Sequence, residues 1–467
     1  MPEVVIVGGG VSGMAVGFEL LERGLDPVEL LVLEGAHRPG GHLRAERAEG
    51  FTVEAGPNGF LDNSPPTLAL VERLGLGPRL LPSEESAAVR FLFARGRLRR
   101  VPAGPGGMLV SGLLPLPGIL RIFAEPLIPR GGTSDETVFD FAARRIGRAA
   151  AAGLVDAMVS GVFAGDARQL ELRAAFPRMA AMEADHGGLV KAMFALRKRR
   201  KREGAASAGG GPSGPSGRLT SFVDGFEELP RALAARLGAS LRTGAPVDAV
   251  ERRGNDWTVR LRGGEAIDAS AVVLACAAPR SAGMLSALDP RLVEELAAIP
   301  LASIAVVATG YRADEAGRDL KGFGFLAPRD QGLRSLGCLW DSSIWPDRAP
   351  EGRVLLRTMV GGFRDPGAID LSDDELLAIV AADLERSMGL TARPVFTRVF
   401  RHRDGIAQYP PGHTARLGRL RDLLAEHPGL LVSGSSYGGI SVNHCLAEAP
   451  DVAQRVLEAL PRTAGCN

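Results

Sequence analysis

The stretch VVIVGGGVSG at residues 4–13 decides the fold. Its first four residues are valine and isoleucine, a run that is typical of a buried parallel strand. Gly8, Gly10 and Gly13 then follow the G-x-G-x-x-G spacing. In such a triplet one glycine makes a tight turn, one lets the backbone approach a pyrophosphate, and one lets helix and strand pack closely. The helix predicted over residues 14–21 would offer free N–H groups and a partial positive charge to phosphates.

A second apolar strand is predicted at residues 30–33, and it ends in Glu34, about 20 residues past the last glycine. An acid at this place suits a ribose hydroxyl of an adenine dinucleotide and repels a 2′-phosphate. The two strands therefore predict a dinucleotide-binding domain. The residues expected to contact the nucleotide here are Gly8, Gly9, Gly10, Ser12, Gly13 and Glu34.

Composition narrows the class of protein. A chain of 467 residues is long enough for two or three domains. Lys plus Arg number 55 and Asp plus Glu 54, so the net charge of +1 gives no electrostatic case for nucleic-acid binding. The four cysteines show no C-x-x-C spacing and the seven histidines no H-E-x-x-H pair, so we expect reduced thiols and no metal. We also expect no signal peptide and no membrane-spanning helix.

Seven short segments carry a resemblance to a known family. GGGVSG (8–13), EGAHRPGG (34–41) and EAGPN (54–58) resemble the FAD-binding signature of the flavin amine-oxidase superfamily. Within it, four later segments resemble the oxygen-dependent protoporphyrinogen oxidase family: GVFAGD (161–166), GFGFL (322–326), QYPPGH (408–413) and SYGGISVN (436–443). The resemblance spans essentially the whole chain in the same order. It implies FAD as cofactor, a porphyrinogen substrate and molecular oxygen as electron acceptor.

The expected fold class is α/β, with a Rossmann-type FAD-binding domain, a mixed-sheet substrate domain and a helical membrane-associated domain. The resemblance divides the chain accordingly. The FAD-binding domain comprises residues 1–85, 219–297 and 420–467, the substrate-binding domain 86–100 and 298–419, and the helical domain 101–218.

Further cofactor contacts are implied by the resemblance. Val247 is expected against the adenine, and a helix starting near Val442 would point its N-terminus at the pyrimidine end of the flavin. The sequence departs from the family at His444, where an acid is common, and Asn443 is expected to cap the helix. The other implied contacts are Arg38, Gly41, His42, Gly56, Pro57, Asn58, Gly59, Ile440 and Ser441.

The resemblance also assigns the substrate's surroundings. Arg90 would pair with a propionate as a bidentate fork, whereas on sequence alone it reads as a solvated arginine at the edge of a hairpin over residues 87–101. Gly161 would bring its carbonyl near the tetrapyrrole, or else cap the helix predicted over 149–160. Phe323 and Ile304 would sandwich the macrocycle. The alternation of Phe323 with Phe325 otherwise predicts two rings on one face of a core strand. Asn58 would line the pocket near the flavin.

Two segments bear on membrane contact. Residues 108–128 are apolar, but Pro115, Pro117 and Pro126 break any long helix, so short helices resting on a membrane surface are expected. A helix beginning near Ser134 or Asp135 should follow. Six cations at residues 197–202 precede a Gly/Ser/Pro tract, and residues 197–218 are predicted to be a flexible linker. The expected location is cytoplasmic with peripheral membrane contact, and a homodimer is left open.

The activity implied is the FAD-dependent six-electron oxidation of protoporphyrinogen IX to protoporphyrin IX. Coproporphyrinogen III, with four carboxylates, is the alternative substrate. More distant alternatives are an amine oxidase, a carotenoid desaturase, or a lipid-binding escort without catalysis. Few lysines and only three tyrosines speak against the lysine and aromatic cage of an amine oxidase. The group that accepts the pyrrole protons is not identified by sequence.

Overall fold

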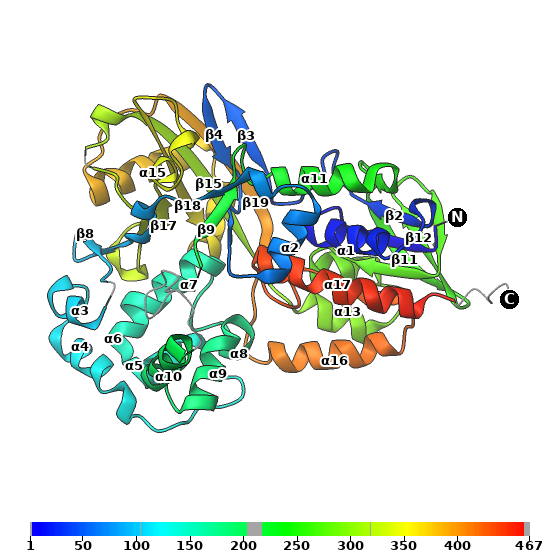
Figure 1. Cartoon of the computed structure of the whole chain (residues 1–467), viewed down its shortest axis with the longest axis horizontal. Helices are drawn as coiled ribbons and strands as arrows, with labels where there is room; N and C mark the ends of the chain where they lie inside the picture. The colour runs from blue at the N-terminus through cyan, green and yellow to red at the C-terminus, as the bar shows by residue number, and fades with distance from the viewer. Residues whose placement is uncertain (1, 103, 203–216, 318, 462–467) are drawn as a thin grey trace.

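The computed structural model describes residues 2–102, 104–202, 217–317 and 319–461. Two large sheets and a group of helices make up the molecule, which is a mixed α/β protein (Figure 1). In that view the sheet carrying the first strand lies on the right, the second sheet at the upper left and the helical group below it.

The first sheet has five parallel strands, and β1 lies at its centre. Val4 of β1 is in register with Leu30 on one side and Ala271 on the other, so the strands end together at one edge. In pairing order the strands are β10 (Leu241–Arg242), β2 (Leu30–Leu33), β1 (Val4–Val7), β14 (Ala271–Leu274) and β20 (Leu430–Val432).

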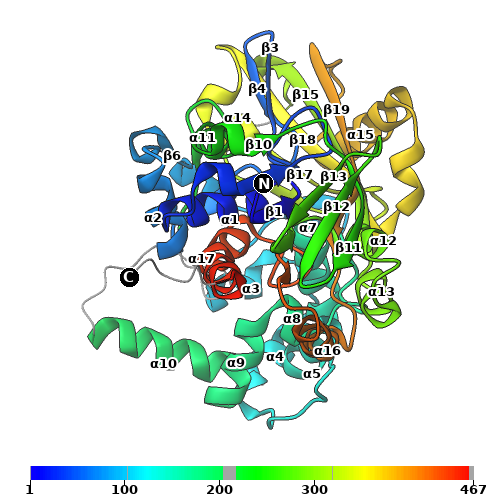
Figure 2. The same cartoon turned by 90° about the vertical axis from the view of Figure 1, so that its right-hand side faces the viewer.

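Both faces of this sheet are covered, which explains its uninterrupted apolar strands. Val4 and Ile6 face a core built with helices α1 (Val11–Glu22), α2 (Pro65–Arg73), α11 (Glu228–Leu237) and α17 (Val442–Ala459). Val5 and Val7 face the opposite core. The elements of that core lie on the other side of β1 from α1 and α2 (Figure 2). That core contains the antiparallel strands β11 (Val247–Arg253), β12 (Asp256–Leu261) and β13 (Ala266–Ala269), with α12 (Ala278–Met284), α13 (Pro290–Ala297) and α16 (His413–Ala425).

The second sheet has seven strands, antiparallel except for the pairing of β16 with β7. All seven come from residues 91–100 and 301–407. In pairing order they are β19 (Phe396–Ala407), β15 (Leu301–Arg312), β18 (Arg353–Gly361), β17 (Ser335–Leu339), β16 (Gly324–Leu326), β7 (Phe91–Ala94) and β8 (Arg97–Arg100). The turn at Arg95-Gly96 has positive φ at both residues, as the predicted hairpin requires.

Small elements join the two sheets. The hairpin of β3 (Ala45–Ala48) and β4 (Phe51–Glu54) packs on the second sheet, where Phe51 stacks on Phe396 with ring centroids 4.5 Å apart. Helix α15 (Asp373–Met388) covers the opposite face. The remaining small elements are β5 (Phe60–Leu61), β6 (Leu80–Pro82), β9 (Leu219–Phe222) and α14 (Asp341–Ile344).

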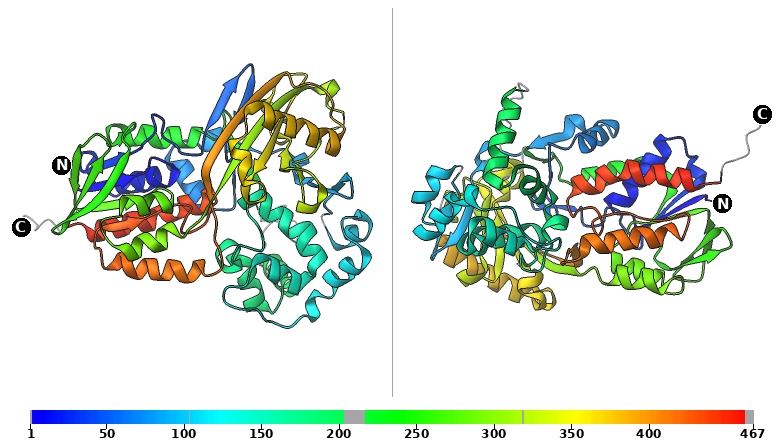
Figure 3. Two further views of the ribbon diagram at one scale, coloured as in Figure 1. Left: turned by 180° about the vertical axis from the view of Figure 1, so that it is seen from behind. Right: turned by 90° about the horizontal axis from the view of Figure 1, so that it is seen from below.

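The helical group comes from residues 105–202 and forms its own layer beside the second sheet (Figures 1 and 3). Glu125 and Arg145 form a fully buried ion pair at its centre, and Glu125 also accepts hydrogen bonds from the N–H groups of Leu189 and Val190. Its helices are α3 (Pro105–Ser111), α4 (Leu116–Phe123), α5 (Val138–Ile146), α6 (Arg148–Ala150), α7 (Asp156–Phe163), α8 (Leu172–Ala175), α9 (Pro177–His186) and α10 (Leu189–Arg202). No helix within the described ranges is both long and apolar enough to cross a bilayer.

Helix boundaries in this group correct three sequence predictions. Thr137, not Ser134 or Asp135, caps α5, because its hydroxyl accepts from the N–H of Asp140. The helix predicted to end before Gly161 continues through a π-helical turn (Ala151–Val155) to Phe163, so Gly161 lies inside α7 and Ala164 ends it. Residues 197–202 are helical, since a run of lysine and arginine following Leu189–Leu196 retains good helix propensity. Of the rest of the predicted linker, residues 203–216 lie outside the described ranges, and residues 217–218 lead directly into β9.

Candidate active site

The glycines of the turn between β1 and α1 differ in their surroundings: Gly8 and Gly13 pack against backbone atoms, and Gly10 faces open space. A Cβ on Gly8 would lie 2.7 Å from the carbonyl oxygen of Ala275, and a Cβ on Gly13 would lie 2.0 Å from that of Gly8. These two glycines are therefore required for packing. A Cβ on Gly10 would meet nothing within 4 Å, so Gly10 faces open space beside the first turn of α1. This is the arrangement that a phosphate-binding turn needs.

Glu34 lies beside this turn at the end of β2. Its two carboxylate oxygens accept hydrogen bonds from the N–H groups of Gly9 (2.9 Å) and Ala36 (2.8 Å). The side chain is thereby fixed at the edge of the sheet and stays half-buried. Val247 is the first residue of β11. The residue before it, Pro246, lies close to Gly35, because a Cβ placed on Gly35 would be 3.5 Å from the Cα of Pro246. Ser12 is buried in α1.

The loop of residues 38–42 touches the glycine turn. The N–H of Gly40 donates to the carbonyl of Gly9 at 2.7 Å, and a Cβ on Gly41 would lie 3.4 Å from the Cα of Gly10. Arg38 holds the loop itself, because its guanidinium donates to the carbonyls of Pro39, Gly41 and Leu43 and to Glu227. Arg38, which the resemblance implies as a cofactor contact, is thus engaged in shaping the loop.

Residues 56–59 form a third loop at the same edge. A Cβ on Gly56 would lie 2.5 Å from the carbonyl oxygen of His42, and one on Gly59 2.5 Å from that of Thr220. Pro57 is exposed. The side-chain amide nitrogen of Asn58 is buried and has no hydrogen-bond partner within the described ranges. An orphaned buried donor is costly unless a ligand accepts from it.

The start of α17 completes this edge. Ser441 caps the helix by accepting from the N–H of His444, and the His444 ring nitrogen Nδ1 lies 2.9 Å from the same hydroxyl. The expectation that Asn443 is the cap is wrong, because its amide instead donates to the carbonyl of Leu61 and accepts from Thr67. Ile440 is half-buried and Val442 buried.

Three glycine-rich turns and a helix N-terminus therefore converge on one edge of the parallel sheet. Free N–H groups, a fixed acid and an orphaned amide are the groups that a dinucleotide cofactor requires, so these residues fit FAD. No cluster of His, Cys, Asp and Glu in the described part of the chain could hold a metal ion.

The residues predicted to contact substrate lie along α7 and the second sheet. The Arg90 guanidinium carbon is 5.4 Å from the centroid of the Phe323 ring, and Arg90 has no ion pair or side-chain hydrogen bond within the described ranges. Partial desolvation lowers its pKa, although the group remains a cation. A Cβ on Gly161 would lie 2.6 Å from a methyl carbon of Leu326 on β16. Ile304 packs with Ala164, the residue that ends α7 three positions after Gly161.

Phe323 and Phe325 do not share a face, contrary to the prediction. Phe325 is buried in the core under α15, whereas Phe323 is half-buried beside Trp345. Gly324 between them has φ +123°, a conformation that breaks the regular alternation of a strand. This break turns Phe323 toward Arg90.

Three side chains at the junction of the two sheets were missed by sequence reasoning. Arg357 on β18 donates to the carbonyls of Glu54 (3.1 Å) and Gly56 (2.6 Å), and it pairs with the buried Asp341. His402 on β19 lies with its Nδ1 3.1 Å from Nδ1 of His42. No short-range pattern could have linked Arg357 to Glu54 and Gly56, or His402 to His42, because about 300 or more residues separate them in the chain.

Partial desolvation by the groups packed around them lowers the pKa of both histidines. For His42 the pKa falls to about 4, with His402, Arg280 and Arg38 adding to the effect of desolvation. For His402 desolvation outweighs the hydrogen bond to the carbonyl of Ala55. Both rings are therefore neutral at pH 7.

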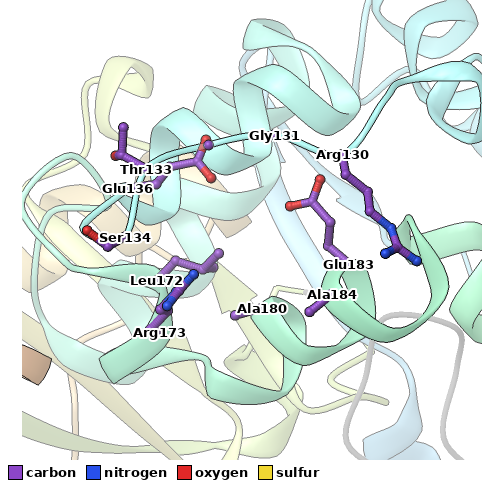
Figure 4. A pocket seen from close by; sticks show the side chains of 11 residues that line it. Arg130, Gly131, Thr133, Ser134, Glu136, Leu172, Arg173, Ala180, Glu183 and Ala184 are labelled. Atoms are coloured by element: carbon purple, nitrogen blue, oxygen red, sulfur yellow. The ribbon is translucent and has the colours of Figure 1, made fainter.

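Two pockets lie outside these contacts. The first has a volume of about 260 Å³ and is lined by Arg280, which lies near His42. The other residues that line this pocket are Pro279, Ala297, Ile299, Pro300, Leu301 and Asp404. The other, of about 170 Å³, lies in the helical group between the 130–134 loop and α9 (Figure 4). None of the predicted site residues lines it, and its carboxylates Glu136 and Glu183 are already paired with Arg144.

The fold therefore combines a glycine-rich edge of a parallel sheet that fits FAD with a second sheet that carries apolar side chains and an arginine. The family model described as flavin containing amine oxidoreductase matches residues 11–457. The chain belongs to this family and is an FAD-dependent oxidoreductase.

The curated relatives are similar over nearly their whole length. The chain is 29% identical over 456 residues to the coproporphyrinogen III oxidase of Bacillus subtilis, covering 95% of each chain. It is 32% identical to the protoporphyrinogen oxidase of Macaca fascicularis, covering 98% of this chain and 99% of the relative. A solved structure of a proposed protoporphyrinogen oxidase from Exiguobacterium sp. 255-15 superposes with a TM-score of 0.83 at 25% identity, covering 98% of this chain and 99% of that one.

Proposed function

We propose that the protein oxidises protoporphyrinogen IX to protoporphyrin IX, removing six electrons in three turnovers of FAD with molecular oxygen as acceptor. The observation that carries the proposal is that the Arg90 guanidinium lies over the ring of Phe323 and has no ion pair among the residues that the structure describes. An aromatic wall with a free cation at its rim suits a large apolar macrocycle that ends in carboxylates.

The surrounding residues have separate tasks in this proposal. Arg90 binds a propionate and so sets the orientation of the ring. Phe323 and Ile304 supply apolar walls, and Gly161 leaves room at the surface of α7, where it is exposed. When bound, FAD accepts the hydride that leaves a bridge carbon. The work of the chain is to hold that carbon at the cofactor and to exclude water.

The cofactor contacts predicted from sequence are proposed for the edge described above, with Asn58 donating its free amide N–H to the bound cofactor. We propose that the parallel sheet with residues 1–85, 219–297 and 420–467 forms the FAD-binding domain. The seven-stranded sheet, whose strands lie within 86–100 and 298–419, would form the substrate domain.

A coproporphyrinogen is the second candidate substrate. The relative from Bacillus subtilis is named for coproporphyrinogen III and matches 95% of the chain. That substrate carries four carboxylates, so it would need cations beyond Arg90, and Arg280 lines a pocket without an ion pair in the described part of the chain.

Peripheral contact with a membrane is proposed for α3, α4 and the turn after them. Leu116, Leu120 and Phe123 follow the i, i+4, i+7 spacing of one helix face, and all three are exposed. Leu109, Val110 and Leu127 add to this surface, with Val110 87% and Leu127 84% exposed. Exposed apolar groups concentrated in one region of a protein mark an interaction surface.

Anaerobic mixing of the purified holoenzyme with each porphyrinogen tests the proposal. We expect the flavin absorbance to bleach and porphyrin fluorescence to appear when air is admitted. Faster bleaching with coproporphyrinogen III would assign the second substrate. Bleaching with neither substrate, or a colourless protein that refuses added FAD, would refute the proposal.

A further inference from the structure

A hydrogen-bonded chain of three groups links the cofactor loop to the second sheet. The ring nitrogen Nε2 of His402 lies 2.6 Å from the carbonyl oxygen of Ala55, and its Nδ1 lies 3.1 Å from Nδ1 of His42. The two rings meet edge to face, with centroids 5.1 Å apart. Ala55 belongs to the loop that leads to Asn58, and His42 belongs to the loop that touches Gly10.

The direction of each hydrogen bond follows from the chemistry of the partners. A carbonyl oxygen only accepts, so His402 carries its proton on Nε2 and donates to Ala55. Because His402 is neutral, its Nδ1 has a lone pair and accepts from Nδ1–H of His42. His42 is neutral as well, so its Nε2 is left without a proton. This tautomer is assigned from the network.

The free nitrogen is available to a ligand. Nε2 of His42 has no hydrogen-bond partner within the described ranges, and the residue is exposed. The strand register places His402 directly opposite Ile304, on the same face of the sheet. The chain of groups thus stands where the cofactor loops meet the proposed substrate wall.

We propose that His42 is the proton acceptor of this site, whose Nε2 takes the pyrrole N–H proton when a bridge carbon of the substrate gives up its hydride. The assignment rests on the proposed function. His402 acts through His42: it is a positioning residue that fixes the tautomer.

The step balances in atoms and electrons. The bridge C–H bond breaks and its electron pair leaves with the hydrogen as hydride to FAD. The pyrrole N–H bond breaks, its electrons stay with the ring system, and the proton bonds to Nε2 of His42. The imidazolium returns this proton when molecular oxygen takes the two electrons and the hydride's hydrogen, giving hydrogen peroxide. The substrate has then lost two hydrogens and oxygen has gained two.

The charges around the pair suit a transient acceptor. Arg38 from the same loop and Arg280 from α12 face His42, and Arg44 and Arg357 face His402. The two arginines near His42 disfavour its imidazolium, so His42 stays neutral before the step and readily gives the proton back. A weak base suffices, because loss of a hydride makes the remaining pyrrole N–H strongly acidic.

His42→Asn is the informative variant, since the Asn amide can still donate toward His402 but offers no counterpart of Nε2. Single-turnover reduction of the holoenzyme's FAD is measured anaerobically with whichever porphyrinogen the unmodified protein oxidises. We expect the rate constant at pH 7.5 to fall at least about 100-fold and added imidazole to restore at least a tenth of it. His186→Asn, an exposed histidine at the end of α9, is the matched control and should react like the unmodified protein.

His402→Phe tests the positioning role and remains informative if His42→Asn loses FAD. Without His402 one cause of the low His42 pKa disappears, so the acid limb of the reduction rate should move upward from about pH 4 toward 6.5. Nitrogen-15 NMR of histidine-labelled holoenzyme should show His42 protonated on Nδ1 alone at pH 7.

The outcomes separate the two proposals. If the unmodified protein reduces its flavin with a porphyrinogen while His42→Asn reacts within threefold of it, the acceptor assignment is wrong and the proposed function stands. A proton on Nε2 of His42, or an acid limb unmoved in His402→Phe, also overturns it. If the unmodified protein oxidises neither porphyrinogen, the proposed function itself fails.

Discussion

The guanidinium of Arg90 lies over the ring of Phe323, 5.4 Å from its centroid, although 233 residues separate them in the chain. Their contact depends on the parallel pairing of β7 with β16, in which Phe91 is in register with Phe325. The φ of Gly324 then brings the Phe323 ring out of the core. The pair therefore combines a flat wall with a cation that forms no ion pair with any carboxylate in the described part of the chain.

Replacing Arg90 should weaken substrate binding more than it slows chemistry. A charge-assisted hydrogen bond contributes about 1.5–3 kcal/mol, so Arg90→Ala should raise KM roughly 10- to 100-fold with little change in kcat. Arg90→Lys should recover part of the loss, because it keeps the charge but not the fork. Arg97→Ala, an exposed arginine on β8, is the control. Steady-state kinetics showing an unchanged KM for Arg90→Ala would remove Arg90 from the substrate site.

Gly10 and Gly13 should respond differently to the same added methyl group. Gly13→Ala places Cβ 2.0 Å from a backbone oxygen and should prevent folding of the βαβ unit. Gly10 has φ −73° and ψ 176°, which alanine adopts freely, and open space around it. Gly10→Ala apoprotein should therefore unfold at the same denaturant concentration as the parent but bind FAD about tenfold or more weakly, because the methyl group blocks the pyrophosphate. Equal FAD affinity in a fluorescence titration would place the cofactor elsewhere.

Local signals predicted the first strand, turn and helix well and the contacts between the two sheets less well. The strand at 4–7, the turn glycines and the acid at Glu34 lie within one supersecondary unit, so spacing alone was enough to place them. His402 reaches His42 across 360 residues, and that contact depends on the packing of two sheets. Phe323 and Phe325 do not share a face because Gly324 between them has a positive φ. The sequence does not reveal this, since a glycine at positive φ cannot be distinguished from a glycine in a regular strand.

Gly161→Ala should preserve the fold and impair turnover. Alanine gains about 1 kcal/mol over glycine inside a helix, which offsets the displacement of the Leu326 side chain that its Cβ would require. We expect the free energy of unfolding to change by less than about 1 kcal/mol and kcat/KM to fall about tenfold. The double variant with Leu326→Ala relieves the contact. If it regains the activity of Leu326→Ala alone, the loss came from Leu326 and Gly161 does not line the substrate site.

His413 should make the protein less stable in acid. The ring is 1% exposed, stacks on Tyr409 at 4.4 Å and has no hydrogen-bond partner for either nitrogen in the described part of the chain. Burial, reinforced by Arg416, lowers its pKa from 6.5 to about 4. The unfolded chain therefore binds a proton first as the pH falls, and the free energy of unfolding decreases between pH 6.5 and about 4.

The change attributable to His413 can be isolated by substitution. His413 contributes at most about 1.4 kcal/mol per pH unit to the slope of the free energy of unfolding against pH. His413→Phe should remove this contribution while keeping a stacked ring. Urea unfolding of both proteins at several pH values between 4.5 and 8 measures it, with His186→Phe as the exposed control. An identical slope in His413→Phe and the parent would mean that the buried ring does not stay neutral.

The apolar surface on α4 and the following turn should be required for binding to lipid. Leu120 is 58% and Leu127 84% exposed, and full burial of such a side chain contributes about 1.5–3 kcal/mol. The double variant Leu120→Glu, Leu127→Glu should therefore bind phosphatidylcholine–phosphatidylglycerol vesicles at least about tenfold more weakly in co-sedimentation, with FAD content unchanged. Val28→Glu is a matched control, because Val28 is 78% exposed but lies at the far side of the parallel sheet, just before β2. Equal losses in both variants would mean that added charge, and not this surface, sets the affinity. Failure of the unmodified protein to sediment with vesicles would reject membrane contact altogether, and would leave the substrate to reach Arg90 from water.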